Sequence, residues 1–120
     1  MWEYYNANPL GRNVNDCTIR AISLATEKSW DETYKILSEY SRLQGITFSE
    51  VEFINDFLAD RYERFCPPRK TETIRDFMNM KLDGRWLITM RGHITCVIDG
   101  ILYDTFDCSE NFIWCIYHVK

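Results

Sequence analysis

Cysteine and histidine are the residues of this chain that could act as nucleophile and base, and there are five cysteines and two histidines. Cys17 has the most favourable position, because Asn15 or Asp16 before it can cap a helix and helical apolar spacing follows it. A cysteine in the first turn of a helix lies beside unpaired amides and the positive end of the dipole, which favour its thiolate. The sequence therefore predicts Cys17 as a nucleophile; a small buried thiol at a helix start is the alternative.

The base that would accept the thiol proton has two candidates. His93 follows a glycine at the start of an expected strand, whereas His118 lies in an apolar stretch almost at the end of the chain. An imidazole in the second setting is more often packed or solvent-facing than reactive. We therefore expect His93 to act as the base for Cys17.

The acid that would orient this base is indicated by a hairpin. Asp99-Gly100 has the composition of a type I′ turn, which needs positive φ at both positions. A two-residue turn there fixes the register and pairs Thr95 with Asp104. Asp104 then lies diagonal to His93 on the same sheet face, so we expect it to hold the imidazole, and a solvated surface acid is the alternative.

Other side chains near this predicted triad have weaker support. Asp107 falls on the opposite sheet face in the same register. A tetrahedral intermediate also needs an oxyanion hole, to which the Cys17 amide and the side-chain amides of Asn13 or Asn15 can contribute donors. Both asparagines can instead act as turn formers or helix caps, so a purely structural role for them stays open.

The remaining cysteines lie away from helix starts, and we predict structural roles for Cys66, Cys96, Cys108 and Cys115. A zinc site of Cys108, Cys115 and His118 would lack the close C-x-x-C pair of structural zinc, so we expect neither a metal nor a cofactor. Five cysteines cannot all pair within one chain, and the N-terminus lacks the pattern of an export signal. These features predict free thiols in a reducing cytoplasm.

The elements that must position these residues divide the chain into a helical part and a strand part. Apolar spacing predicts helices beginning at Cys17, after Ser29, after Ser49 and after Thr71. Ser29 with Glu32 and Ser49 with Glu52 have the spacing of capping boxes, and Gly45 is a helix stop. Strands are expected over Arg85–Met90, His93–Ile98, Ile101–Phe106 and Phe112–Val119. Helices followed by an antiparallel sheet predict an α+β fold in one domain, residues 1–120.

The amino-acid composition limits the classes of function that we expect for the protein. The 46% hydrophobic content of these 120 residues is enough for a packed core. A net charge of −4 makes nucleic acid an unfavourable partner, because the field around the protein repels phosphate. The apolar runs are far shorter than the roughly 20 residues of a membrane helix, so we do not expect a membrane-spanning protein.

Three features together carry a resemblance to a known superfamily: a cysteine that begins the first helix, Gly-His at a strand start and an aspartate on the next strand. With them the chain resembles the papain-like cysteine peptidases, and most closely their small bacteriocin-processing-type domains in bacteria and phages. The stretch from Asn15 to Ser23 is also similar to the nucleophile helix of ovarian-tumour-type deubiquitinases.

The resemblance implies a helical half with the nucleophile Cys17 packed on an antiparallel sheet with the base His93 and the orienting Asp104. It implies a peptidase or isopeptidase acting on a peptide or protein substrate, in the host cytoplasm if a phage encodes it. Two positions depart from the family pattern. No glutamine stands a few residues before the cysteine, where Gly11 is found, and Val14 stands where ovarian-tumour-type enzymes have an aspartate.

Two alternatives to hydrolysis remain at this point. Acyl transfer of the transglutaminase or acetyltransferase kind uses the same three residue types. A binding module that keeps the fold and occupies a host protein is the other alternative, and the missing glutamine favours it. Aromatic side chains could anchor such an interface, although we expect most of them in the core: Trp2, Tyr4, Tyr5 and Trp114.

Overall fold

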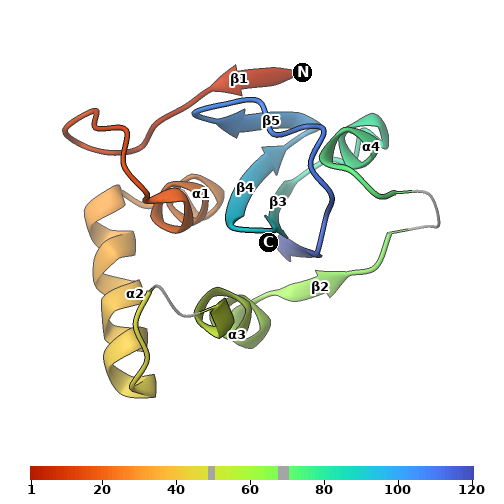
Figure 1. Cartoon of the computed structure of the whole chain (residues 1–120). Helices are drawn as coiled ribbons and strands as arrows, with labels where there is room; N and C mark the ends of the chain where they lie inside the picture. Colours follow the sequence, from red (N-terminus) through yellow and green to blue (C-terminus); the bar gives the residue numbers. More distant parts are fainter. Residues whose placement is uncertain (49–50, 68–70) are drawn as a thin grey trace.

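The computed structural model describes residues 1–48, 51–67 and 71–120. Within these ranges the chain forms four helices and one six-stranded sheet (Figure 1), and the predicted α+β class is confirmed. The helices are α1 (Cys17–Thr26), α2 (Trp30–Gln44), α3 (Val51–Arg61) and α4 (Ile74–Asn79). The strands are β1 (Trp2–Tyr4), β2 (Glu63–Phe65), β3 (Arg85–Met90), β4 (His93–Ile98), β5 (Ile101–Asp104) and β6 (Cys115–Val119).

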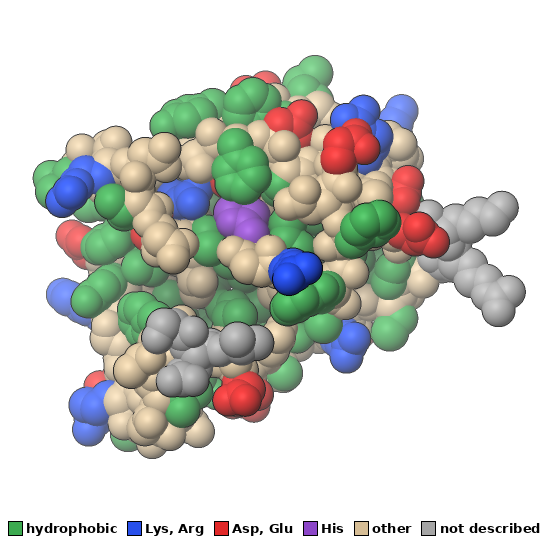
Figure 2. Space-filling model, viewed as in Figure 1, with side chains coloured by type: hydrophobic (Ala, Val, Ile, Leu, Met, Phe, Trp, Pro, Cys, Tyr) green, Lys and Arg blue, Asp and Glu red, His purple; other side chains and the backbone are tan. Residues whose placement is uncertain are grey.

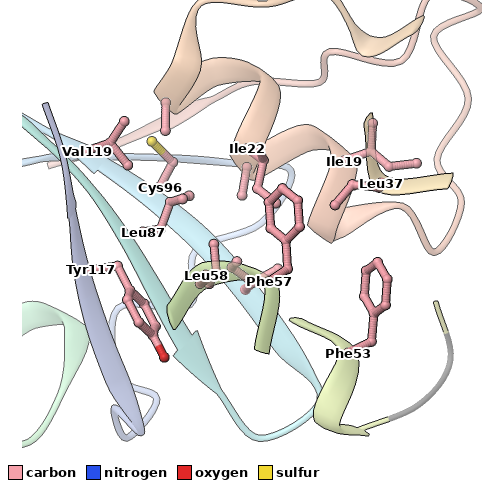
Figure 3. Close-up of a cluster of buried hydrophobic side chains, with 13 residues drawn as sticks. Ile19, Ile22, Leu37, Phe53, Phe57, Leu58, Leu87, Cys96, Tyr117 and Val119 are labelled. Carbon is pink, nitrogen blue, oxygen red and sulfur yellow. The ribbon is translucent and has the colours of Figure 1, made fainter. Parts of the chain in front are cut away.

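The sheet has the strand order β1-β5-β4-β3-β6-β2, so the hairpins β3–β4 and β4–β5 form its centre. Side chains alternate across these strands and separate two cores. One core packs Leu87 and Cys96 against α1, α2 and α3, and Figure 3 shows Ile22 and Phe57 pointing into it. The other core packs Ile88 and neighbouring residues against α4. Helices therefore cover both faces of the central strands.

Local signals explain where the helices begin and end. Ser29 and Glu32 form the predicted capping box of α2, and Gly45 ends that helix with φ +69°. The fourth helix begins later than expected, because Thr73 rather than Thr71 is its cap and forms a capping box with Asp76. The predicted capping box of α3 involves Ser49, which lies outside the described residues.

The Asp99-Gly100 turn has φ values of +50° and +81°, as a type I′ turn requires. Across it Ile98 pairs with Ile101 and Cys96 with Tyr103, so the predicted register is confirmed. This turn fixes which residues of β4 and β5 lie side by side.

The edges of the sheet differ from the prediction. Strands β1 and β2 were not expected, and β1 pairs with β5 in parallel, so the sheet is mixed rather than antiparallel. Strand β5 ends at Asp104, two residues early, and β6 begins only at Cys115. Most of the aromatic residues predicted for the core are exposed, because an edge strand or a loop leaves one side uncovered: Trp2 by 38%, Tyr4 by 64% and Trp114 by 52%. None of the described helices has the length and apolarity to cross a bilayer.

Candidate functional site

Three secondary-structure ends bring the predicted triad together. Cys17 is the first residue of α1, His93 the first of β4 and Asp104 the last of β5. His93 Nε2 lies 2.6 Å from Asp104 Oδ2, a hydrogen-bond distance. Cys17 lines the same cleft as His93 and Ile94, and hydrogen bonding to these two residues lowers the pKa of its thiol. The diagonal placement that the hairpin register predicted for His93 and Asp104 is therefore present.

The Asp104 carboxylate is buried and surrounded by donors. Its Oδ2 also accepts a bond from the Thr95 hydroxyl at 2.7 Å, while Oδ1 accepts from the Thr105 amide at 2.7 Å and from Arg20 at 3.1 Å. Burial alone would raise the pKa of Asp104, but hydrogen bonds from His93, Thr95 and Thr105 bring the pKa below its usual range. The carboxylate is thus held ionised and fixed in orientation.

Arg20 links this carboxylate to a second one. Its Nε lies 2.7 Å from Asp16 Oδ1 and its Nη1 lies 3.1 Å from Asp104 Oδ1, with both acids buried. Asp16 Oδ2 accepts further bonds from Asn8 Nδ2 at 3.2 Å and Trp30 Nε1 at 2.9 Å. The Arg20 side chain is thus salt-bridged to two acids and buried.

The start of α1 is left without a side-chain cap as a result. Asp16 occupies the N-cap position, yet among the described residues its carboxylate makes no capping hydrogen bond. Its oxygens bind Arg20, Asn8 and Trp30 instead. The first amides of a helix have no partner within the helix, so those beside Cys17 remain available to a ligand.

The electrostatics favour a charged pair between Cys17 and His93. Burial opposes a charged imidazole, yet hydrogen bonds to Asp104, Cys108 and Cys17 raise the pKa of His93 to about 11. Burial likewise opposes the thiolate, but hydrogen bonds to His93 and the Ile94 amide, with the nearby positive charges, lower the pKa of Cys17 below its ordinary value. Both directions describe a thiolate beside an imidazolium.

A cleft of about 350 Å³ opens onto this pair and is lined by Cys17 and His93. Figure 2 shows hydrophobic side chains around a histidine on this face of the molecule. Asn15 is exposed and lines the cleft; Asn13 is exposed and is not one of the lining residues. The lining also includes Trp114, which is half exposed. A substrate carbonyl can therefore reach the sulfur from solvent.

Cys108 belongs to this site although we predicted only a structural role for it. Its Sγ lies 3.7 Å from Asp104 Oδ2 and within 4.8 Å of a His93 ring nitrogen, and it is buried. The sequence carries one signal for this position, since a cysteine four residues after the acid lies in a loop that must turn back at the strand end. Its contacts were not predictable without the loop path.

The donor atoms of His93, Asp104 and Cys108 lie within 4.8 Å of one another, close enough to hold a metal ion. Two ligands about 2.0–2.2 Å from a tetrahedral zinc would stand more than about 3 Å apart. The 2.6 Å contact between His93 and Asp104 fits a shared proton better. The zinc set considered from the sequence is not brought together in the described residues, where His118 stacks on Trp86 at 4.2 Å.

No family model, curated protein or solved structure matches the chain.

Proposed function

We propose that the protein is a papain-like cysteine hydrolase that cleaves a peptide or isopeptide bond, with Cys17 as nucleophile, His93 as base and Asp104 as orienting acid. The observation that carries the proposal is the 2.6 Å bond between His93 and Asp104, in a site where the same imidazole lowers the pKa of an accessible thiol. A structural thiol needs no oriented imidazole, whereas a nucleophile does.

The reaction follows from this arrangement. The Cys17 sulfur attacks the substrate carbonyl carbon, and the carbonyl π electrons move onto oxygen. The oxyanion collapses, the C–N bond breaks, and the His93 imidazolium gives its proton to the departing amine. Water then attacks the thioester while His93 takes its proton. The collapse of this second intermediate releases the acid and restores the thiolate beside the imidazolium.

The oxyanion has donors within the cleft. The Cys17 amide is the first of the uncapped amides of α1, and Asn15 from the same wall supplies a side-chain amide. Asn13 is the weaker of the two predicted donors, because it is not among the residues that line the cleft. A reducing compartment such as the cytoplasm would keep Cys17 in its active form.

The first test is alkylation by iodoacetamide from pH 5 to 10, with each labelled cysteine located by mass spectrometry. Cys17 should react at least tenfold faster than the exposed thiol Cys66 at pH 6, because an ordinary thiol with a pKa of about 8.5 holds little thiolate there. His93→Ala should abolish this advantage. Equal rates at Cys17 and Cys66 in the wild type would refute the proposal.

A binding module without turnover is the second candidate, and exposed aromatic side chains near the cleft favour it. Phe48 and Trp114 line the cleft and are 37% and 52% exposed, which suits interface anchors. The same alkylation experiment separates the two candidates, since a binding module has no need of a reactive Cys17. An ordinary alkylation profile at Cys17 would favour binding.

A further inference from the structure

Two buried polar atoms in the cleft lack a partner in the part of the chain that the structure describes. They are the Thr89 hydroxyl oxygen and Asn55 Oδ1. Both residues line the 350 Å³ cleft that contains Cys17 and His93. Thr89 is 2% exposed, so solvent does not satisfy its hydroxyl. Buried polar groups in folded proteins are nearly always hydrogen-bonded, and an exception needs an explanation, which within a cleft a bound ligand can supply.

Thr89 is adjacent to the nucleophile through the sheet. It pairs with Ile94 across β3 and β4, and Ile94 follows His93 on β4 and lines the same cleft as Cys17. Thr89 also lines the cleft that contains Cys17. A substrate held there for attack by Cys17 therefore lies against Thr89 as well.

The other side chains that line the cleft restrict which kind of substrate residue can bind there. The lining includes apolar side chains from several elements, among them Phe48, Ile54 and Met90. It contains no Lys, Arg or Glu among the described residues, its acid, Asp16, is already bound to Arg20, and its imidazole, His93, is already paired with Asp104. A charged substrate side chain would lose its hydration without gaining a counter-ion. A purely apolar one would leave both polar atoms buried and unpaired.

We propose that Asn55 and Thr89 are specificity-determining residues that select a substrate side chain with a primary carboxamide, as in glutamine. The amide NH₂ donates to Asn55 Oδ1, and the amide oxygen accepts from the Thr89 hydroxyl. This inference rests on the proposed function and adds to it the class of residue recognised. Sites built to hydrogen-bond a substrate discriminate strongly against analogues that lack the group.

The stability of two threonine variants tests whether the Thr89 hydroxyl is unpaired. Thr33 is the matched control, because it is 1% exposed and its hydroxyl donates to the Ser29 carbonyl at 2.9 Å. Thr33→Val should lower the melting temperature, whereas Thr89→Val should leave it unchanged or raise it. Equal losses in the two variants would show that the Thr89 hydroxyl is satisfied within the protein and would overturn the proposal.

Binding tests the ligand class directly. Calorimetry on the Cys17→Ala protein would compare acetyl-Gly-Gly-X-Gly-Gly-amide peptides in which X is glutamine, methionine or glutamate. The glutamine peptide should bind about tenfold more tightly than the other two, the worth of a pair of hydrogen bonds. Thr89→Val or Asn55→Leu in the same background should remove most of that difference, while Thr33→Val should keep it.

The outcomes separate this inference from the proposed function. Equal affinity for the glutamine and methionine peptides, or no binding by any peptide, would overturn the inference even if Cys17 proves reactive. An ordinary Cys17 thiol with a retained glutamine preference would instead refute hydrolysis and leave carboxamide recognition standing.

Discussion

Asp104 has two kinds of donor, and they act on different properties of the protein. The hydrogen bond between Asp104 and His93 favours the charged imidazolium in the site. The ion pair with Arg20 compensates the buried negative charge of the carboxylate. Removing the acid should therefore change reactivity, and removing the arginine should change stability. Single substitutions of Asp104 and Arg20 separate these roles.

Asp104→Asn should move the alkylation midpoint of Cys17 to higher pH. Loss of the carboxylate removes the hydrogen bond and charge that raise the pKa of His93, so the imidazolium no longer stabilises the thiolate. A shift of about one pH unit or more is expected, measured as the iodoacetamide rate against pH. Asp107→Asn is the control, because that acid bonds Ser109 instead. A midpoint that is the same in both variants would contradict the orienting role.

Arg20→Met should destabilise the protein by about 3–5 kcal/mol, since it leaves the buried carboxylate of Asp16 without a cation and that of Asp104 with His93 alone. Arg42→Met is the matched control, because its pair with Glu39 is exposed to solvent and should contribute nothing measurable. Urea unfolding at pH 7 measures both variants. A loss for Arg20→Met no larger than that of the control would show that the buried network does not support the fold.

Among the individual residues of the site, the sequence predicts the pair His93 and Asp104 but not the other side chains that contact Asp104. The pair follows from the two-residue turn, because register is a local property. Arg20 and Asp104 stand 84 residues apart, and their contact depends on how α1 packs on the sheet. Cys108 depends in the same way on the path of a loop. Long-range packing of this kind leaves no periodic pattern in a sequence.

Among the elements, the β4–β5 hairpin has the greatest influence on the site, since it sets His93 beside Asp104. Its turn needs a left-handed conformation at Gly100, where φ is +81°. Every residue with a Cβ is strained there.

Gly100→Ala should lower the free energy of unfolding by about 1–2 kcal/mol, the cost of a left-handed conformation for a residue with a Cβ. Asp99→Asn is the control, because asparagine tolerates the positive φ and its side-chain oxygen can still accept from the Gly84 amide. Urea unfolding of the two variants compares them. Equal stability of Gly100→Ala and the wild type would mean that the turn adopts another type.

The elements that the sequence predicts are those with local signals. Helix α2 has a capping box and a glycine stop, and β3 to β5 have β-branched and aromatic runs around a turn. Strands β1 and β2 have three residues each and owe their form to β5 and β6, to which they pair. Strands of this length are too short to show the alternation of apolar and polar residues that predicts a strand. The prediction therefore fails at the sheet edges and holds at its centre.

For the whole molecule, the charged pair shapes the dependence of stability on pH. In unfolded chains His has a pKa of about 6.5 and Cys one of about 8.5. The raised pKa of His93, about 11, stabilises the fold at low pH, and this contribution is lost as pH rises from 6.5 toward 11. The lowered pKa of Cys17 acts oppositely, because its contribution is present above 8.5 and is lost as pH falls.

Between about pH 6.5 and 8.5 the two effects cancel, because folded and unfolded states each hold one proton on the pair. The urea midpoint of the wild type should therefore be flat in that range. In Cys17→Ala only the His93 contribution remains, so the midpoint should fall as pH rises through the same range. Parallel pH profiles for the two proteins would show that the imidazole and thiol are both neutral in the fold.

The N-terminal strand brings residues from the start of the sequence into contact with Asp104 in the site. Strand β1 lies beside β5, Trp2 Nε1 donates to the Asp104 carbonyl at 3.2 Å, and the Tyr5 amide donates to the same oxygen at 2.9 Å. These partners are about 100 residues apart, so closing this contact is among the costlier steps in folding. During synthesis Cys17 leaves the ribosome long before Asp104 does. A nascent chain would carry the thiol without its activating partners, and reactivity would arise only when the last strands close the sheet.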